Sequence, residues 1–202
     1  LSEAEVRCIC DAAHKDTLVV LDEAYIHYSE TEGMLHLLRD YDNLIVLRTF
    51  SKAFGLAGLR VGFGISANPE LIRPLRNIKP TWNMSHIQIA GGAAAVFDDE
   101  HVARAVRTVV ESKAFVAAEM GRLNSFRMVP GCRSNFFLTE ILDTDLNSTK
   151  VFRGLLERGV IVKDGTDIKG LGERYLRVDL NLKKHMERFI GALRQIETGQ
   201  SA

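Results

Sequence analysis

Residues 44–65 contain two short apolar runs, separated by a loop in which one lysine lies among glycines and small hydroxyl side chains. The loop begins Arg48-Thr-Phe-Ser-Lys52 and continues through glycines at positions 55, 58, 62 and 64. Short apolar runs are typical of buried strands, and glycines allow the backbone to approach a ligand closely. An unpaired ammonium is costly to bury among such residues, so the Lys52 amine either reaches solvent or is used chemically. The pattern predicts two strands joined by a ligand-binding loop.

The side chains around Lys52 suit a phosphorylated aldehyde. Thr49 and Ser51 supply hydroxyl donors, and Arg60 supplies a planar cation, so together they can bind a phosphate group. The lysine amine can form a Schiff base with an aldehyde. Pyridoxal 5'-phosphate carries both groups, and its ring nitrogen needs an acidic partner to make the ring an electron sink. We therefore predict this cofactor, which requires a carboxylate elsewhere in the chain.

A suitable carboxylate ends another apolar run, Thr17-Leu-Val-Val-Leu-Asp-Glu-Ala-Tyr25. A continuous apolar run is typical of a buried parallel strand, and functional side chains of open α/β sheets gather at the carboxyl ends of strands. Asp22 is our candidate partner of the pyridine nitrogen, and capping of the following turn is the alternative. Tyr25 can donate a hydrogen bond to the ring oxygen, or it can pack as an aromatic at a domain edge.

Four segments resemble motifs of the fold type I pyridoxal-phosphate-dependent aminotransferases, and within them the histidinol-phosphate aminotransferase group. The segments are Asp22-Glu-Ala-Tyr25, Arg48-Thr-Phe-Ser-Lys-Ala-Phe-Gly-Leu-Ala-Gly-Leu-Arg60, Ser134-Asn-Phe-Phe137 and Tyr175-Leu-Arg177. They follow the order of that group at about its spacing, over essentially the whole chain. The resemblance implies an α/β fold of the PLP-dependent transferase type. A partial large cofactor-binding domain (1–110) would precede a small α+β carboxyl-terminal domain (111–202).

The resemblance also implies a role for each matching residue. Lys52 would form the Schiff base and later move a proton between the substrate α-carbon and the cofactor. Asp22 would bind the pyridine nitrogen, and Tyr25 the ring oxygen. The cofactor phosphate would be bound by Thr49, Ser51 and Arg60.

Three residues further along the chain are candidates for the substrate. Arg177 would hold an α-carboxylate through two hydrogen bonds, and Asn135 lies in the neighbouring motif. Lys163 stands where the histidinol-phosphate group tends to carry arginine, and the two cations are not equivalent in a two-point contact. The residues therefore leave the exact substrate open.

The resemblance implies transamination between an amino acid or histidinol-phosphate-like compound and a 2-oxo acid, by a homodimer in amino-acid biosynthesis. A PLP-dependent decarboxylase of a phosphorylated amino acid shares these motifs and is one alternative. The family's phosphate-binding turn, ring-stacking aromatic and cofactor-side asparagine would all precede Leu1. A non-catalytic fragment that lacks these amino-terminal cofactor ligands is therefore the other alternative.

Composition argues against several other functions. Twenty-six basic and 26 acidic residues leave no formal net charge, which gives no electrostatic reason for binding nucleic acid or a membrane surface. No apolar run approaches the roughly 20 residues that span a bilayer, and the first residues lack the basic start of a secretion signal. We therefore expect a cytoplasmic protein.

Metal and dinucleotide sites are also not expected. Cys8-Ile-Cys10 lacks the second ligand pair of a structural zinc site, and His27, His36 and His86 have no ligand spacing. The segment Gly62-Phe-Gly-Ile-Ser-Ala67 matches a form of the dinucleotide fingerprint, but no acidic residue follows about 20 positions later.

Periodicity and capping residues predict the order of the elements. In the amino-terminal half we expect a helix after Ser2, strands at 18–21, 44–48 and 60–65, and a helix that starts near Asn68. One long helix over 100–123 would link two domains. The remainder should contain strands at 135–139, 160–162 and 175–180, a helix near 149–158 and a final helix from Lys183.

Overall fold

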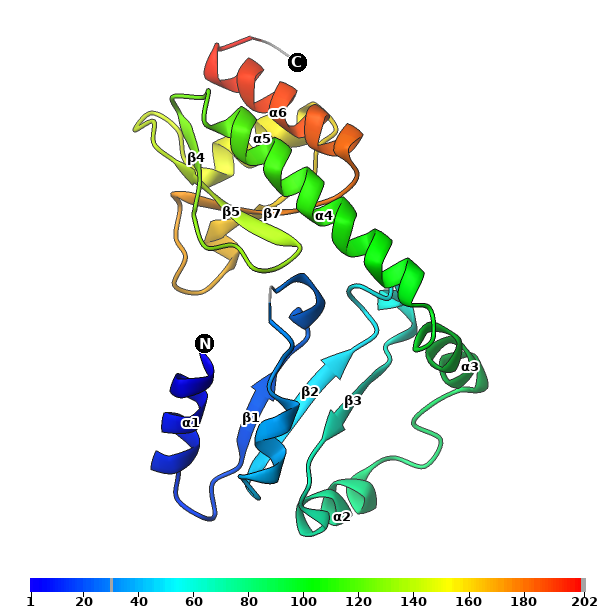
Figure 1. The fold of residues 1–202 in the computed structure, drawn as a ribbon. Helices are drawn as coiled ribbons and strands as arrows, with labels where there is room; N and C mark the ends of the chain where they lie inside the picture. Colours follow the sequence, from blue (N-terminus) through cyan, green and yellow to red (C-terminus); the bar gives the residue numbers. More distant parts are fainter. Residues whose placement is uncertain (30, 201–202) are drawn as a thin grey trace. The chain divides into compact units, whose positions relative to one another are not determined.

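The computed structural model describes residues 1–29 and 31–200 of the 202-residue chain. The chain divides into two compact units, Leu1–Ala103 and Arg104–Ala202. Their boundary falls inside the helix α4 (Asp99–Met120), which occupies the position predicted for a long helix. Each unit is built around a sheet of its own (Figure 1).

The first unit contains a three-stranded sheet in the order β1-β2-β3. Its strands are β1 (Val19–Asp22), β2 (Leu44–Thr49) and β3 (Gly62–Ile65). Strand β1 runs parallel to β2, with Asp22 beside Leu47, and β3 runs antiparallel to β2. The three predicted strands are therefore present, each within two residues of its expected bounds.

One face of this sheet is covered by the helix α1 (Glu3–Ala12) and the short 3-10 helix η2 (Leu35–Arg39). Ser2 begins α1 with a reciprocal capping box to Glu5, as the sequence pattern predicts. The covered face and its helices form one hydrophobic core of Val6, Cys10, Leu37, Leu38, Leu44 and Val46. This packing fixes the strands from one side.

The opposite face of the sheet is open in the described part of the chain. Val20 of β1 is 52% exposed and Leu47 of β2 is 36% exposed, whereas Val46 is fully buried. The expectation of a strand buried on both faces is therefore wrong for β1. The reason is that side chains alternate between the two faces of the sheet, and α1 and η2 pack against only one of these faces. The open face is the one that carries Asp22.

Two further helices, α2 (Pro69–Ile78) and α3 (His86–Ala95), follow β3. Asn68 caps α2, with Pro69 in its first turn, as predicted. Ser85 caps α3 and forms a reciprocal box with Gln88. Gly91 brings α3 close to the loop before β3, since a Cβ at Gly91 would lie 2.6 Å from a methyl carbon of Leu59. The helix α3 thus packs directly on the lysine-bearing loop.

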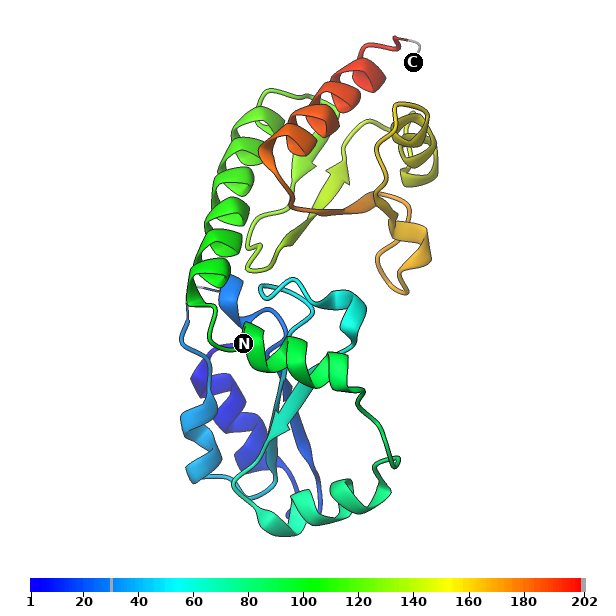
Figure 2. The same ribbon diagram turned by 90° about the vertical axis from the view of Figure 1, so that its right-hand side faces the viewer.

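The second unit is a four-stranded antiparallel sheet in the order β4-β5-β7-β6. Its strands are β4 (Phe126–Met128), β5 (Phe136–Ile141), β6 (Lys163–Asp164) and β7 (Tyr175–Asp179). Together with α4, the helices α5 (Ser148–Glu157) and α6 (Lys183–Glu197) pack against this sheet (Figures 1 and 2). The fully buried side chains of this core include Phe126, Phe137, Ile141, Leu155, Leu176 and Phe189.

The strand predicted at 160–162 is absent, and pairing begins only at Lys163. These residues instead finish α5, because Gly159 takes a left-handed φ of +69° and the Val160 amide donates to the Leu155 carbonyl. Ile161 then lies 81% exposed. The short strand β4 was not predicted, since its three residues show too little alternation to stand out.

A buried carboxylate joins α5 to the sheet of the second unit. Asp164 is 7% exposed and accepts hydrogen bonds from the Ser148 hydroxyl, the Thr149 hydroxyl (2.8 Å) and the Thr166 amide (3.0 Å). Burial by itself raises the pKa of this carboxyl, but the hydrogen bonds outweigh it, so the pKa lies below its usual value.

This lowered pKa makes the second unit sensitive to acid. Because the folded pKa is below the unfolded value of about 3.9, the stabilisation is complete above that pH and is lost as pH falls through the folded pKa. We expect Asp164→Asn to lower the urea midpoint at neutral pH and to flatten its decline in acid. Urea unfolding of both proteins at a series of pH values measures this, and an equally steep decline in the variant would contradict it.

Candidate functional site

Lys52 lies in the loop between β2 and β3, at the edge of the sheet where β1 also ends. The loop is held by its own backbone: the Leu56 amide donates to the Phe50 carbonyl (2.9 Å), and the Phe50 amide donates to the Val61 carbonyl (3.1 Å). Gly55 supplies a left-handed turn at φ +72°. The loop therefore presents Lys52 from a fixed backbone.

The amine of Lys52 lies over an aromatic ring from the other motif of this unit. Its Nζ is 4.9 Å from the centroid of the Tyr25 ring, within the range of a cation–π contact. Tyr25 immediately precedes the short 3-10 helix η1 (Ile26–Tyr28), just after β1. The structure thus brings together two segments that the sequence separates.

Asp22 is the last residue of β1 and lies on the open face of the sheet. Its Oδ1 accepts a hydrogen bond from the Ala24 amide at 2.9 Å, so the turn-capping alternative is observed. The carboxylate is nevertheless exposed, so capping leaves it accessible. Asp22 can serve both the turn and a ligand.

Two glycines of β3 lie on the same face of the sheet as Asp22. Gly64 stands beside Leu47, which itself pairs with Asp22, and Gly62 stands beside Thr49. A Cβ at Gly62 would lie 2.9 Å from the Arg48 carbonyl oxygen, so no side chain fits there without a shift. A flat aromatic ring with polar substituents suits a surface of this kind.

The phosphate-side candidates lie at the two ends of the loop. The Thr49 hydroxyl donates to the Val61 carbonyl (3.3 Å) and accepts from the Ser51 amide (3.0 Å). Arg60 adopts a left-handed φ of 55°, which is rare for a residue with a Cβ. Such outliers cluster at ligand-binding positions, and its guanidinium donates to the Ala57 carbonyl at 3.2 Å.

These residues fit pyridoxal 5'-phosphate by the chemistry of their donors. An amine suits the aldehyde, an exposed carboxylate suits the ring nitrogen, and hydroxyls with a guanidinium suit the phosphate. All of them belong to the first unit.

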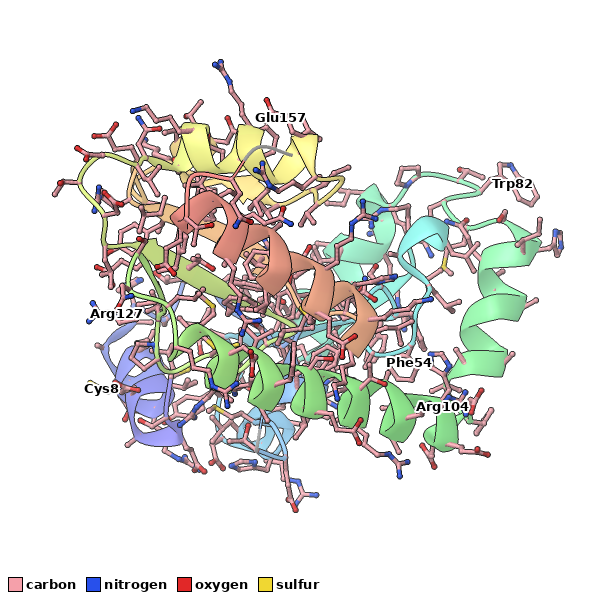
Figure 3. All side chains as sticks on the ribbon, turned by 90° about the horizontal axis from the view of Figure 1, so that it is seen from above. Cys8, Phe54, Trp82, Arg104, Arg127 and Glu157 are labelled. Carbon is pink, nitrogen blue, oxygen red and sulfur yellow. The ribbon has the colours of Figure 1, made fainter. Side chains whose placement is uncertain are left out.

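The sequence did not reveal the support behind the loop. Gln88 of α3 donates from its side-chain amide to the Leu59 carbonyl at 2.7 Å, next to the turn that holds Arg60. The spacing of Ser85 and Gln88 is that of a capping box, and it was the available signal. Trp82, which follows α2, is 92% exposed, and its side chain points outward in Figure 3, so it does not pack in the core.

The substrate-side candidates belong to the second unit. Lys163 and Arg177 are paired in register on β6 and β7, so they lie side by side on the sheet. Arg177 stacks with its guanidinium carbon 3.9 Å from the Phe136 ring centroid. The backbone carbonyl of Asn135 accepts from the Leu180 amide at 2.7 Å, which holds the end of the sheet.

Each of the two cations also has a carboxylate partner. Arg177 Nη2 is 3.2 Å from Asp179 Oδ1, and Lys163 Nζ is 2.7 Å from Asp167 Oδ2. Both cations border a cavity of about 560 Å³, which His185 and Arg188 also line. Several basic side chains therefore line the cavity, and two of them, Lys163 and Arg177, are already paired with carboxylates.

None of the helices described in the structure is both long and apolar enough to cross a membrane. Residues 1–29 and 31–200 contain no group of three His, Cys, Asp or Glu side chains placed to hold a metal ion.

Residues 1–193 match the model of a protein family described as aminotransferase class I and II. The chain belongs to this family. A histidinol-phosphate aminotransferase of Anaeromyxobacter sp. (strain Fw109-5) is 39% identical to this chain. The aligned region covers 96% of this chain and 52% of that protein. The chain thus spans about half the length of the curated relatives it matches. Pyridoxal 5'-phosphate is the cofactor of this family, which confirms the cofactor prediction.

Solved structures show the same fold. The histidinol-phosphate aminotransferase of Clostridium acetobutylicum superposes with a TM-score of 0.89 at 20% identity, over 98% of this chain and 60% of that one. The enzyme of Sinorhizobium meliloti, solved in complex with pyridoxal-5'-phosphate, has a TM-score of 0.80 at 25% identity, over 98% and 54%. The predicted fold class, a partial PLP-dependent transferase of mixed α/β type, is confirmed.

A ring contact between His27 and the lysine loop gives a prediction about the pH dependence of stability. His27 packs edge-on against Phe54, with ring centroids 5.0 Å apart. Burial lowers the pKa of His27, and the positive charge of Arg48 lowers it further. Since the unfolded chain then binds a proton more tightly, the free energy of unfolding falls as pH drops below about 6.5.

We expect His27→Gln to reduce this loss of stability between about pH 8 and pH 5, because glutamine does not titrate in that range. The test is the urea midpoint of each protein across the range. His14→Gln, which changes an exposed histidine, is the matched control. Identical slopes in wild type and His27→Gln would show that His27 does not contribute.

Proposed function

We propose that this chain supplies the Schiff-base lysine and the substrate carboxylate site of a pyridoxal-phosphate-dependent aminotransferase. The observation that carries the proposal is the 4.9 Å contact between Lys52 Nζ and the Tyr25 ring. It joins the lysine loop to the segment of Asp22 at one edge of a parallel strand pair. Membership of the aminotransferase family supports the assignment.

In this proposal each side chain has one task. The exposed carboxylate of Asp22 pairs with the pyridine nitrogen, and Tyr25 donates to the ring oxygen. Thr49, Ser51 and Arg60 bind the phosphate. Bound pyridoxal 5'-phosphate supplies the electron sink for bonds at the substrate α-carbon. The Lys52 amine is the general base and acid that moves the proton at that carbon.

The second unit supplies the substrate side of the proposed reaction. Arg177 and Lys163 bind anionic groups of the two substrates, and Asn135, immediately before β5, also contributes to the substrate site. We infer a histidinol-phosphate-like amino donor and a 2-oxo acid acceptor, because similar proteins are named histidinol-phosphate aminotransferases. The adjacent cations of β6 and β7 support a substrate with a carboxylate or phosphate.

The architecture of the working enzyme is part of the same proposal. Residues 1–110 belong to a larger cofactor-binding domain, and residues 111–202 form a small carboxyl-terminal domain. Two copies associate as a cytoplasmic homodimer. The competing functions are a decarboxylase of a phosphorylated amino acid and a fragment without activity of its own.

Reductive trapping tests the proposal and separates it from the fragment alternative. The chain is mixed with pyridoxal 5'-phosphate, reduced with borohydride and digested for peptide mass spectrometry. We expect one adduct at Lys52, which Lys52→Ala abolishes, because this amine is held in a fixed loop. Lys15→Ala, at an exposed lysine, is the control and should leave the adduct unchanged. Adducts scattered over surface lysines would favour a fragment that does not form the site.

A second prediction concerns the substrate cation. Arg177→Lys should weaken binding of 2-oxoglutarate by about tenfold, since loss of one charge-assisted hydrogen bond costs about 1.5 kcal/mol. NMR titration of the chain with 2-oxoglutarate measures the dissociation constant. Arg127→Lys changes an arginine of β4 that pairs with Glu140 in the same sheet, and it should leave the constant unchanged. Equal effects of the two variants on the dissociation constant would show that Arg177 is not part of the substrate site.

A further inference from the structure

Glu23 is a buried carboxylate that the proposed chemistry does not use. It directly follows Asp22, and its side chain is only 5% exposed. Successive side chains of a strand point to opposite faces, so Asp22 lies on the open face and Glu23 on the covered one. The Glu23 amide still donates to the Leu47 carbonyl at 2.9 Å, so this residue continues the strand pairing.

Arg48 is the residue of β2 that corresponds to Glu23, because each of them follows one residue of the pair Asp22 and Leu47. It directly precedes Thr49 and leads into the lysine loop. Its Nε and Nη2 lie 2.9 and 2.8 Å from Glu23 Oε2, which is a two-nitrogen contact to one oxygen. The other oxygen, Oε1, accepts from the Met34 amide at 2.6 Å. Both carboxylate oxygens are therefore engaged, as a buried charge requires.

The backbone at Gly33 lies close against this pair. Gly33 has a φ of +83°, and a Cβ there would lie 2.7 Å from Arg48 Nη2 and 2.9 Å from Glu23 Oε2. The pair thus connects the end of β1, the end of β2 and the turn at residues 33–34. Glu23 is 5% exposed and Arg48 20% exposed, so water screens this pair less than it screens an exposed ion pair, and the pair holds the three segments together more firmly.

We propose that Glu23 and Arg48 are positioning residues, which fix the end of β1 relative to the lysine loop. This inference rests on the proposed function of Asp22 and Lys52. The two residues act through their neighbours: Glu23 holds the segment of Asp22 and Tyr25, and Arg48 holds the segment that leads to Lys52. The contact between Lys52 and Tyr25 spans the two segments, so it reports on the pair without any cofactor.

Lysine NMR provides this cofactor-free measurement. Reductive methylation with 13C-formaldehyde labels each lysine and keeps its charge. The signal of Lys52, assigned with Lys52→Ala, should be displaced from the other lysines by the ring current of Tyr25. In Glu23→Gln this displacement should be largely lost, because the variant keeps the shape of the side chain but removes the charge that binds Arg48.

A matched control separates positioning from general loss of charge. Glu3→Gln removes an exposed glutamate, whose contact with Arg7 has a similar length of 2.8 Å, and it should leave the Lys52 signal in place. Arg48→Lys is the second variant: it keeps the charge but loses a guanidinium nitrogen, and it should reduce the ring-current displacement of Lys52 less than Glu23→Gln does. The methyl signals of Leu44 report whether the core stays folded.

Reductive trapping then connects the pair to the proposed function. Glu23→Gln should lower the yield of the Lys52 adduct by about tenfold or more, since a misplacement near 1 Å can cost up to 10²-fold. An undisplaced Lys52 signal in wild type, or the same displacement in both variants and wild type, would overturn the inference. Absence of the adduct in wild type, together with a displaced signal that Glu23→Gln removes, would overturn the proposed function but leave the positioning role supported.

Discussion

The parallel pairing of β1 with β2 is the constraint on which the candidate site depends. Its register sets Asp22 beside Leu47, and the two strands end at the same edge of the sheet. The turn after β1 and the loop after β2 therefore emerge next to each other, and Tyr25 meets Lys52 there. Because side chains alternate along a strand, a shift by one residue would move Asp22 to the covered face and Glu23 to the open one. The ion pair of Glu23 and Arg48 opposes that shift, because the shift would move Glu23 to the open face and leave Arg48 without its carboxylate.

The two faces of the first sheet have different tasks for the same reason. Apolar side chains and the helices α1 and η2 cover one face and hold the strands in place. The other face carries the exposed carboxylate of Asp22 and two glycines of β3, at positions 62 and 64. A bulky side chain next to Asp22 on the open face would occupy the space proposed for the cofactor ring. In the proposed function, stability and binding thus depend on opposite faces of three short strands.

Much of this fold could be predicted from the sequence, because its signals are local. The capping box of Ser2, the apolar runs of β1 and β2 and the Asn-Pro start of α2 each act over a few residues. The exposed face of β1 and the helix-ending role of 160–162 could not be predicted, since both depend on what packs nearby. The motif residues around Lys52 were identified from type and spacing. Their support by Gln88 and by the Glu23–Arg48 pair depends on contacts between distant segments, which no spacing reveals.

The carboxylate partners of Lys163 and Arg177 would make the proposed substrate site selective among anions. Arg177 and Lys163 face a shared cavity, yet Asp179 and Asp167 already occupy part of their hydrogen-bonding capacity. All four of these side chains are at least one-third exposed, so the existing pairs are weak and screened by water. An anion that binds both cations at once can replace them, because it gains two charge-assisted contacts in a single step. An anion that reaches only one cation gains little over the carboxylate it displaces. In the proposed function, the pairing of β6 with β7 would therefore favour a substrate whose anionic group is large enough, or carries enough charge, to contact both strands.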